Sequence, residues 1–449
     1  MIKHLYKILI LTALTGFTLA GCSKSTQYDL PEVTTVQPVF EAATGKVWSG
    51  GNVPGDDYYI SGYGICWSTT NSTPTISDSK TSETLNRLAF ASSISDITAG
   101  TTCYVRAYAA NTTGTSYGEV YTIQIPAAST IDAQVTTLAG NSAAGFVDGT
   151  GTSASFNYPM GVWADNTGDI YVADSYNSAI RKVTSTGEVT TFTGKGSIGY
   201  LDGSLTDAQF YACSGIVGDN NGNFYVADRG NNMIRKISGN TVTTFAGTGV
   251  AGSENTTGIS ASFNTPASIV LSSTGYLFVA DNGNSLIRRI DPTAVVTTFA
   301  GNLTTGLINR AGTDAALNKP NAMAIDASGN IYVAETANHD IRKIDINGNV
   351  STIVGSPENT SVVGNPTGLA VDASGNLYIS DATGRILKLG TDNVLSVIAG
   401  SATAGYADGT GSSALFNSPQ GLTIDAIGNL YVADYANQRI RKITFTTPN

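Results

Sequence analysis

Histidine is nearly absent from this chain of 449 residues, which contains only two histidines and four cysteines. His4 lies in an N-terminal segment that we expect to be removed, so the mature protein keeps His339 alone. One histidine cannot supply the several imidazole ligands of a histidine-rich zinc site. Any Ser-His-Asp triad would have to use His339. The composition therefore excludes multi-histidine metal enzymes.

Charged side chains are scarce as well. Asp, Glu, Lys and Arg together make up 13% of the chain, about half of the quarter that is usual in soluble proteins. Lys and Arg number 24 and the acidic residues 34, which gives a formal net charge of −10. A nucleic-acid-binding protein has the opposite balance, because its affinity comes from Lys and Arg that displace the counterions of phosphates. We therefore expect no nucleic acid among the partners.

Long apolar runs are missing too, apart from one near the N-terminus that extends from Ile8 to Leu19. Lys3 and Lys7 precede this run, and it is too short to cross a bilayer as a helix. A short apolar run behind positive charges is typical of a signal peptide. We predict that residues 1–21 are removed and that the protein is exported.

The apolar run ends in Leu19-Ala20-Gly21-Cys22, which resembles the lipobox of bacterial lipoproteins. The resemblance implies cleavage before Cys22 and acylation of its thiol, which would anchor the protein to a membrane of the cell envelope. Residues 22–33 would then form a flexible tether. They have no acidic cluster beside the cysteine, so the periplasmic and the external face of the membrane both stay open. The alternative is an ordinary secretory signal that ends at a cysteine by chance.

Residues 34–126 have short alternating runs, broken by turn residues, and no helical period. Between Cys103 and Ala109 every second residue is small or apolar, as in a strand with one buried face. Several such runs at short spacing predict an antiparallel β-sandwich. Residues 96–118 resemble the end of a fibronectin type III domain, although that family usually has an aromatic residue where Cys103 stands. The resemblance implies a spacer or docking unit, and residues 127–134 are predicted to be a linker.

Two cysteines lie in this small domain. An oxidising compartment would allow Cys66 and Cys103 to form a disulfide. The sequence leaves this pairing open, because it does not show whether the two residues are close in space. Cys213 has no evident partner.

The rest of the chain is built from repeats. A Tyr-Val-Ala-Asp motif or a close variant occurs six times, and the copies end at Asp174, Asp228, Asp281, Glu335, Asp381 and Asp434. An apolar strand and a glycine turn precede each motif, and a strand such as Ile-Arg-Lys-Ile follows it. A fourth strand such as Val-Thr-Thr-Phe-Ala-Gly ends all units but the last. Four short strands per repeat are typical of one blade of a β-propeller, so the motifs predict six blades within residues 135–447.

The repeated motifs also resemble a known family. Pro-x-Gly, Gly-Asn-x-Tyr-Val-Ala-Asp and Asn-x-x-Ile-Arg-Lys-Ile recur in the order found in the NHL repeat. The predicted fold class is therefore all-β, with a fibronectin type III-like sandwich followed by a six-bladed NHL-type propeller. The resemblance leaves the function open, because propellers of this kind serve many functions.

The ends of the repeat region predict how the ring closes. The last unit lacks its own fourth strand, and one copy of that strand is left over at the front, in residues 135–140. We predict that this segment pairs with the strand around Ile440–Ile443. Closure would remove the exposed strand edges that otherwise recruit other chains.

The loop between each fourth strand and the next first strand has a nearly constant length. Measured from the closing glycine to the position of the next proline, five of these loops span 19 residues, and the loop from Gly355 to Pro366 spans 11. Antiparallel strands place these loops on the same face as the loops that follow the Tyr-Val-Ala-Asp motifs. We call this face the loop face, and we predict a recess in it over blade 5.

The polar residues that repeat in every unit are poor candidates for a site, because chemistry needs a given residue only once. We expect the motif aspartates, and the asparagines three residues later, to close turns by bonding backbone amides. We expect the arginines of the Ile-Arg-Lys strands to pair with acidic neighbours within the blades. These arginines are Arg181, Arg235, Arg288, Arg342 and Arg441.

Residues that break the repeat are more informative. Tyr176, Arg229 and Tyr435 follow the motifs and belong to residue types that are enriched in binding hot spots. Glu335 interrupts the series of aspartates and lies four residues from His339. We predict that these five residues form a ligand-binding site on the loop face, toward the recess over blade 5. The alternative is ordinary variation in solvated loops.

Two classes of function fit these observations. The preferred interpretation is a membrane-anchored binding or scaffold protein that presents its propeller to a protein, peptide or glycan. The alternative is a propeller enzyme, similar to a lactonase, another hydrolase or a lyase, that would use carboxylates and calcium in place of a histidine zinc site. The sequence identifies no catalytic residue, no metal ligand and no required cofactor. If the protein is an enzyme, calcium is the cofactor that the sequence allows.

Overall fold

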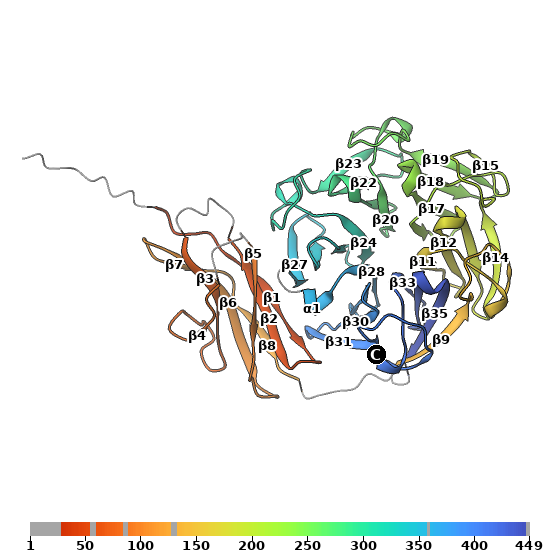
Figure 1. The fold of residues 1–449 in the computed structure, drawn as a ribbon. Helices are drawn as coiled ribbons and strands as arrows, with labels where there is room; N and C mark the ends of the chain where they lie inside the picture. The colour runs from red at the N-terminus through yellow and green to blue at the C-terminus, as the bar shows by residue number, and fades with distance from the viewer. Residues whose placement is uncertain (1–27, 54–59, 84–88, 127–132, 357–359, 446–449) are drawn as a thin grey trace, which may run out of the picture.

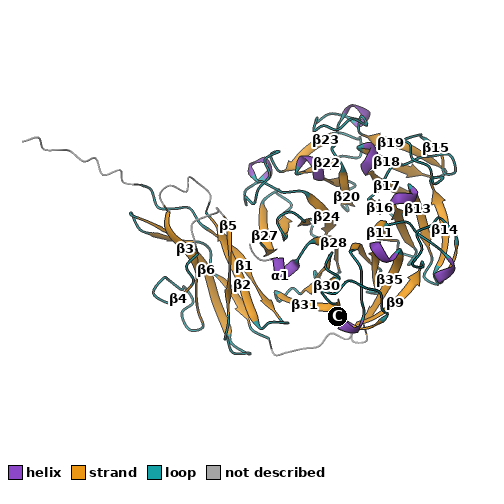
Figure 2. Cartoon of the chain, viewed as in Figure 1, coloured by secondary structure: helices purple, strands orange, loops and turns teal. Residues whose placement is uncertain are grey.

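The computed structural model describes residues 28–53, 60–83, 89–126, 133–356 and 360–445. The predicted leader with Cys22 and most of the predicted linker lie outside these ranges. Six sheets surround a central channel, and a smaller unit of two sheets lies beside the ring (Figure 1). Strands make up nearly all of the regular structure (Figure 2). Within the described ranges, no helix is long and apolar enough to cross a membrane.

Each sheet of the ring is one blade, with four antiparallel strands that run outward from the channel in chain order, except that β9 supplies the fourth strand of blade 6. Blade 1 consists of β11 (Pro159–Ala164), β12 (Ile170–Asp174), β13 (Ala179–Val183) and β14 (Glu188–Thr193). Blade 2 consists of β16 (Gly215–Gly218), β17 (Asn223–Asp228), β18 (Met233–Ser238) and β19 (Thr241–Ala246). Blade 3 consists of β20 (Pro266–Leu271), β21 (Leu277–Asp281), β22 (Leu286–Ile290) and β23 (Val296–Ala300). Blade 4 consists of β24 (Pro320–Ile325), β25 (Ile331–Glu335), β26 (Asp340–Ile344) and β27 (Val350–Gly355). Blade 5 consists of β28 (Pro366–Val371), β29 (Leu377–Asp381), β30 (Arg385–Leu389) and β31 (Val394–Gly400). Blade 6 consists of β33 (Pro419–Ile424), β34 (Leu430–Asp434), β35 (Arg439–Phe445) and β9 (Ala133–Ala139).

The inner strands are apolar and closely spaced because neighbouring blades cover both of their faces. All five residues of β12 are buried. Around the channel the first strands of adjacent blades nearly touch: a Cβ atom on Gly161 would lie 2.4 Å from the carbonyl oxygen of Ser214, and one on Gly421 would lie 2.5 Å from that of Met160. Only glycine, which has no Cβ, fits at these positions. In these blades the glycine of the Pro-x-Gly motif is therefore a packing requirement, whereas blades 3 and 4 have Ser268 and Ala322 at the same position.

Ring closure follows the sequence prediction. β9 pairs antiparallel with β35, with Val135 opposite Ile443 and Ala139 opposite Ile440. All four of these side chains are fully buried. Blade 6 is thus built from both ends of the repeat region, and the segment left over at the front supplies its missing strand.

The long loops cover the outer edges of most blades. β10 (Gly149–Thr150), β15 (Gly203–Ser204) and β32 (Gly409–Thr410) pair with the outermost strands of blades 1, 2 and 6. Single bridges, from Thr257 to Val295 and from Ala311 to Asn349, do the same in blades 3 and 4. The described part of the short loop before blade 5 forms the small helix α1 (Thr360–Val363) and adds no strand to β31.

The N-terminal unit consists of two antiparallel sheets that face each other across an apolar core. One sheet contains β1 (Thr34–Glu41), β2 (Lys46–Asn52) and β5 (Ala89–Ile94), and the other contains β3 (Ile60–Ser68), β4 (Ser79–Lys80), β6 (Thr102–Asn111), β7 (Thr115–Tyr117) and β8 (Tyr121–Gln124). Val47, Ile65 and Val105 are among the buried residues of this core.

The two cysteines of this unit are buried and not bonded to each other. Cys66 on β3 lies opposite Arg106 on β6. Residues that face each other across a ladder share one side of the sheet, and Cys103 is three positions from Arg106, so its side chain points to the other side. The register therefore separates the two thiols.

The sandwich docks on the propeller at blade 5. β1 runs parallel to β31, and the amides of Phe40 and Ala42 donate to the carbonyls of Asn393 and Leu395, both at 3.0 Å. Val39, 2% exposed, belongs to the same buried cluster as Leu395. β1 thus covers the strand edge that the other blades cover with their own long loops. Of the two roles that the sequence left open for this unit, spacer or docking unit, this contact fits the docking unit.

Candidate functional site

The repeated arginines hold the blades and loops together, as the sequence predicted. Arg181 is fully buried, and its Nη1 donates to Asp174 Oδ2 at 3.0 Å while its Nη2 donates to Asp148 Oδ1 at 2.5 Å. Asp174 ends β12, whereas Asp148 belongs to the long loop, so one side chain ties the loop to its own blade. The same arrangement recurs at Arg235, Arg288, Arg342 and Arg441, with Asn255 and Asn309 in place of the loop aspartate in blades 3 and 4.

Blade 5 departs from this pattern in two linked ways. Its loop is too short to supply the second acceptor, and Leu387 occupies the position of the arginine. Leu387 is 1% exposed and packs in the cluster that also contains Val39 of the sandwich. A buried guanidinium without its partners would be very costly. The short loop and the loss of the arginine therefore belong together.

One of the five predicted site residues, Glu335, has a structural position, which corrects that part of the prediction. Glu335 is fully buried, and its Oε2 accepts from Arg342 Nη1 at 2.8 Å and from Asn338 Nδ2 at 2.9 Å. It takes the place of the aspartate of the other blades and is not presented to a ligand. His339 has a positive φ of 54°, and its Nδ1 lies 2.7 Å from the carbonyl oxygen of Gly364, which links blade 4 to the loop before blade 5.

Two other predicted residues, Tyr176 and Tyr435, meet around a third tyrosine. The ring of Tyr158 lies 4.8 Å from that of Tyr176 and 4.7 Å from that of Tyr435, measured between centroids. Tyr158 and Tyr176 belong to blade 1 and Tyr435 to blade 6, so the contact crosses the boundary where the ring closes. We call these three residues the tyrosine row. Tyr176 is 62% exposed.

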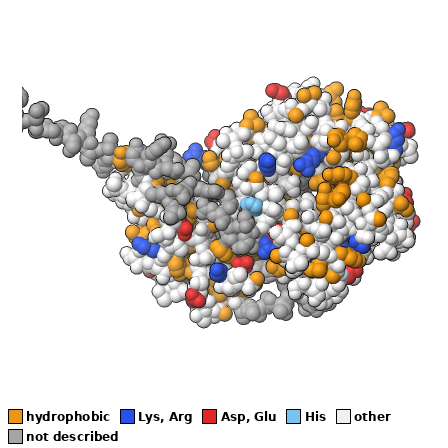
Figure 3. All heavy atoms as spheres, viewed as in Figure 1, with side chains coloured by type: hydrophobic (Ala, Val, Ile, Leu, Met, Phe, Trp, Pro, Cys, Tyr) orange, Lys and Arg blue, Asp and Glu red, His pale blue; other side chains and the backbone are white. Residues whose placement is uncertain are grey.

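The tyrosine row lies beside the mouth of the central channel. Asn282 and Thr336 occupy the position of Tyr435 in blades 3 and 4, and each donates to the carbonyl of the proline that begins the next blade. Tyr435 reaches the same place in blade 1, where Tyr158 precedes Pro159, and Met160 then lines the channel. Figure 3 shows hydrophobic side chains gathered over blades 1 and 2.

Arg229 and a further tyrosine continue this surface onto blade 2. Gly230 stands where blade 1 has Tyr176, and the ring of Tyr211 fills the space above it: a Cβ on Gly230 would lie 2.4 Å from that ring. Tyr211 is 42% exposed. Arg229 is close enough to Tyr435 for its charge to act on the pKa of that phenol.

Tyr158 and Tyr211 were not among the residues predicted from the sequence. Tyr158 has a positive φ of 53°, and Ala212, Thr265, Lys319 and Ser418 have the same backbone conformation at the equivalent positions. A tyrosine among these small or polar residues breaks the repeat just as Tyr435 does. Applying the criterion of non-repeated residues to the end of the long loops, as well as to the loops after the motifs, would have found it.

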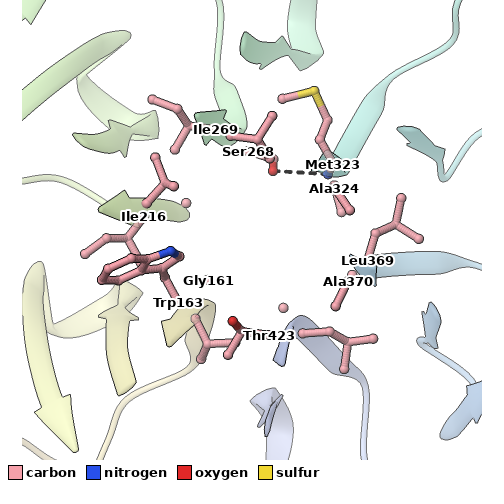
Figure 4. A pocket seen from close by; sticks show the side chains of 18 of the residues that line it. Gly161, Trp163, Ile216, Ser268, Ile269, Met323, Ala324, Leu369, Ala370 and Thr423 are labelled. Carbon is pink, nitrogen blue, oxygen red and sulfur yellow. Dashed lines mark hydrogen bonds between the residues drawn. The ribbon is translucent and has the colours of Figure 1, made fainter. Parts of the chain in front are cut away.

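The channel itself encloses about 390 Å³ and is lined by the first strands of all six blades. Figure 4 shows Trp163, Ile216, Ser268, Met323, Leu369 and Thr423 around it. None of its lining residues is charged. The donor set therefore does not fit a calcium ion held by carboxylates, because hard cations take oxygen ligands that are mostly anionic. The described residues also contain no group of three or more His, Cys, Asp or Glu side chains placed to hold a metal ion.

Comparison with known proteins identifies the repeat. The model of the NHL repeat matches residues 156–183 and 416–443, which lie in blades 1 and 6. The chain is 40% identical over 91 residues to Protein SUPPRESSOR OF QUENCHING 1, chloroplastic, of Arabidopsis thaliana. This match covers 20% of the chain and 9% of that larger protein. The chain thus contains NHL repeats, and it corresponds to only a small part of this relative.

Solved structures show the same overall fold. A protein of unknown function from Bacteroides thetaiotaomicron superposes with a TM-score of 0.55 at 19% identity, and an auxiliary nutrient binding protein from Bacteroides ovatus with a TM-score of 0.53 at 16% identity. Each comparison covers 93% of this chain and 98% of the other. The likeness therefore extends beyond the propeller into the N-terminal unit, and at these identities it concerns the fold alone.

Proposed function

We propose that this protein binds a ligand on the loop face of its propeller, at the tyrosine row beside the channel mouth. The observation that carries the proposal is the contact of Tyr158 with both Tyr176 and Tyr435. Aromatic side chains bring a large contact area at a low entropic cost, and tyrosine and arginine are the types most often found in binding hot spots. The row is assembled from two blades and occurs once in the ring.

The asymmetry of the ring supports this choice. At the positions of Tyr158 and Tyr435 the other blades have small or polar residues, and two of these, Asn282 and Thr336, donate to the neighbouring blade. Folding therefore does not require tyrosine there. A protein of the same fold is described as nutrient binding, which agrees with a binding function for this chain.

The enzyme alternative receives no comparable support. A lactonase-like site would need carboxylates around the channel, and a lyase-like site several histidines. The channel lining contains only uncharged residues, and the one histidine outside the predicted leader, His339, contacts a backbone carbonyl. We therefore propose binding without catalysis.

We further propose that the protein is exported and anchored through acylated Cys22, with residues 34–126 as a fibronectin type III-like unit. The lipobox-like segment supports the anchor. The strand order β1-β2-β5 opposite β4-β3-β6-β7 supports the fibronectin type III likeness, because such domains pair a three-stranded sheet with a larger one. The contact of this unit with blade 5 leaves it beside the ring, away from the tyrosine row.

The proposal is tested by probing immobilised glycans and peptides with the wild-type protein and with Tyr158→Ala. Alanine fits at this position, since Ala212 has the same backbone conformation in blade 2. Tyr200→Ala, which removes a 68% exposed tyrosine from the long loop before blade 2, is the matched control. We expect Tyr158→Ala alone to lose the signals. Signals that both variants keep would place the ligand elsewhere.

A further inference from the structure

The tyrosine row is neutral, with apolar ring faces and polar edges. Burial and a hydrogen bond with Tyr176 raise the pKa of Tyr435 to about 12. Its hydroxyl therefore stays protonated at physiological pH and keeps its ability to donate as well as accept. A surface of this kind suits a ligand that has apolar faces and neutral hydroxyl groups.

The neighbouring channel mouth has the same character. Asn321 and Gln420 are the second residues of β24 and β33, and both are partly exposed and line the channel. Ser214 and Thr367 also line it, but they are buried and their hydroxyls donate to the carbonyls of Pro266 and Pro419. Side-chain amides both donate and accept hydrogen bonds, so Asn321 and Gln420 match ligand groups that do the same. Carboxylates and ammonium groups, which would select a charged ligand, are absent from the channel lining.

The angles between the three tyrosine rings further limit the class of ligand that can stack on them. The plane of Tyr158 is inclined by 53° to that of Tyr176 and by 43° to that of Tyr435. A rigid flat ligand can stack on only one of these rings at a time. Sugar units joined by glycosidic bonds turn relative to one another, so successive units can each meet a ring at its own angle. A pyranose ring is about as wide as a phenol ring, which gives the row room for more than one unit.

A peptide is the main competing ligand. Peptides commonly bind by adding a strand to a free sheet edge. Tyr176 and Tyr435 belong to loops after the second strands of their blades, and Tyr158 belongs to the loop before β11. The row therefore offers aromatic faces and no strand edge.

We infer that the ligand of the tyrosine row is an uncharged oligosaccharide, whose sugar faces stack on Tyr158 and Tyr176 and whose hydroxyl groups bond Tyr435 and the polar side chains of the channel mouth. This inference rests on the proposed function and specifies the class of its ligand. The three rings place the sugar units at the boundary between blades 1 and 6.

The test uses the full mature chain and neutral polysaccharides as probes, namely linear glucans, mannans and xylans in affinity gel electrophoresis. Oligosaccharides of each retarding polymer are then measured by calorimetry. We expect at least one polymer to retard the protein, and Tyr158→Ala and Tyr435→Ala each to weaken binding about tenfold or more. Ala382 stands at the position of Tyr435 in blade 5, so both alanines have a counterpart in the fold. Melting temperatures should be unchanged, and Tyr200→Ala should bind normally.

Charge is tested separately. Affinity for an uncharged sugar should not change with ionic strength, and Arg229→Gln, which keeps hydrogen-bond donors without the charge, should bind almost as well as wild type. Binding that weakens with salt and in Arg229→Gln would show an anionic ligand and overturn the inference. Failure of every neutral saccharide would also overturn it. If peptides bind and their binding depends on Tyr158, the proposed function is supported and only the ligand class is wrong. If saccharides bind equally well to wild type and Tyr158→Ala, the proposed site is wrong.

Discussion

Glu335 illustrates how a residue that breaks a repeat can still have the role of the residue it replaces. Its side chain is one methylene longer than aspartate, yet it accepts from the arginine and the asparagine of its blade as the aspartates do. Both Glu335 and Arg342 are fully buried. Removing one member of a buried pair leaves the other charge without compensation, which costs about 3–5 kcal/mol.

We therefore expect Glu335→Ala to lower the free energy of unfolding by about 3–5 kcal/mol, measured by denaturant titration. Glu335→Asp, which restores the residue of the other blades, should lose far less. Ligand affinity of the folded variant should be unchanged, because Glu335 does not reach the loop face. A variant that melts like wild type but binds poorly would return Glu335 to the ligand site.

Asp340, five residues after Glu335 in blade 4, is a buried carboxyl group that has no arginine or asparagine donor of its own among the described residues. It is fully buried, and neither of its oxygens has a hydrogen-bond partner in the part of the chain that the structure describes. Burial and the neighbouring Glu335 raise its pKa well above the ordinary value. Blades 2 and 3 have Met233 and Leu286 at this position, so the fold accepts an apolar residue there.

The raised pKa makes stability depend on pH in a defined direction. Above about pH 4 the unfolded chain loses the proton of Asp340 while the folded protein keeps it, so the free energy of unfolding falls as pH rises. Asp340→Leu should remove this dependence. Above about pH 4, and as long as the folded protein keeps this proton, the stability of wild type relative to Asp340→Leu should fall by up to about 1.4 kcal/mol per pH unit. Parallel pH profiles in urea melts would show that Asp340 ionises normally.

At the scale of elements, blade 5 differs from the other blades in several features that depend on one another. Its preceding loop is short, its buried arginine is replaced by Leu387, and its outermost strand β31 pairs with β1 of the sandwich. An uncovered strand edge exposes unpaired backbone groups and invites association with other chains. In blade 5 the sandwich covers this edge through β1. We therefore expect each unit to stabilise the other.

Val39→Asp should disrupt this contact, because it places an unpaired charge in the cluster that contains Leu395. Loss of the burial of Val39 alone costs about 1.5–3 kcal/mol. We expect faster hydrogen exchange at the amides of Phe40 and Ala42, which donate to blade 5. Ala43→Asp, at an exposed position of the same hairpin, is the control. Unchanged exchange in Val39→Asp would mean that the docking does not depend on this cluster.

At the scale of the whole molecule, the sandwich and the tyrosine row lie at different parts of the ring. The sandwich is attached to the side of the ring at blade 5 (Figure 1). The tyrosine row lies at the boundary of blades 6 and 1. An anchor at Cys22 would join the membrane to the N-terminal side of the sandwich. The tyrosine row would then remain accessible while the protein is attached.

The anchor predicts a simple change of fraction. Two or more acyl chains give durable membrane attachment, whereas an unmodified chain has none. Cys22→Ser should therefore move the protein from the detergent phase to the aqueous phase in a detergent partition experiment. The variant should still bind its ligand, because Cys22 belongs to the anchor alone. Retention of Cys22→Ser in the detergent phase would contradict lipidation at this residue.

Much of the architecture was predictable because repetition makes local signals additive. Each motif predicts only a strand and a turn, but six copies at a nearly constant spacing predict blades, and a leftover strand predicts where the ring closes. The buried arginine pairs followed for the same reason: a polar residue that recurs in nearly every blade serves the fold that recurs with it. Local patterns in the chain were therefore enough to predict the propeller, its closure and the structural role of its repeated charges.

The contacts between residues that do not repeat from blade to blade follow from the closed ring and from no local pattern. Tyr158 and Tyr435 lie at opposite ends of the repeat region and touch only because the ring closes between them. Glu335 looked exceptional in the sequence, but burial in its blade gives it an ordinary role. The strand edge that the short loop before blade 5 leaves uncovered is paired with β1, more than 300 residues earlier in the chain. Such contacts join segments whose proximity no local pattern encodes, so they appear only when the whole chain is folded.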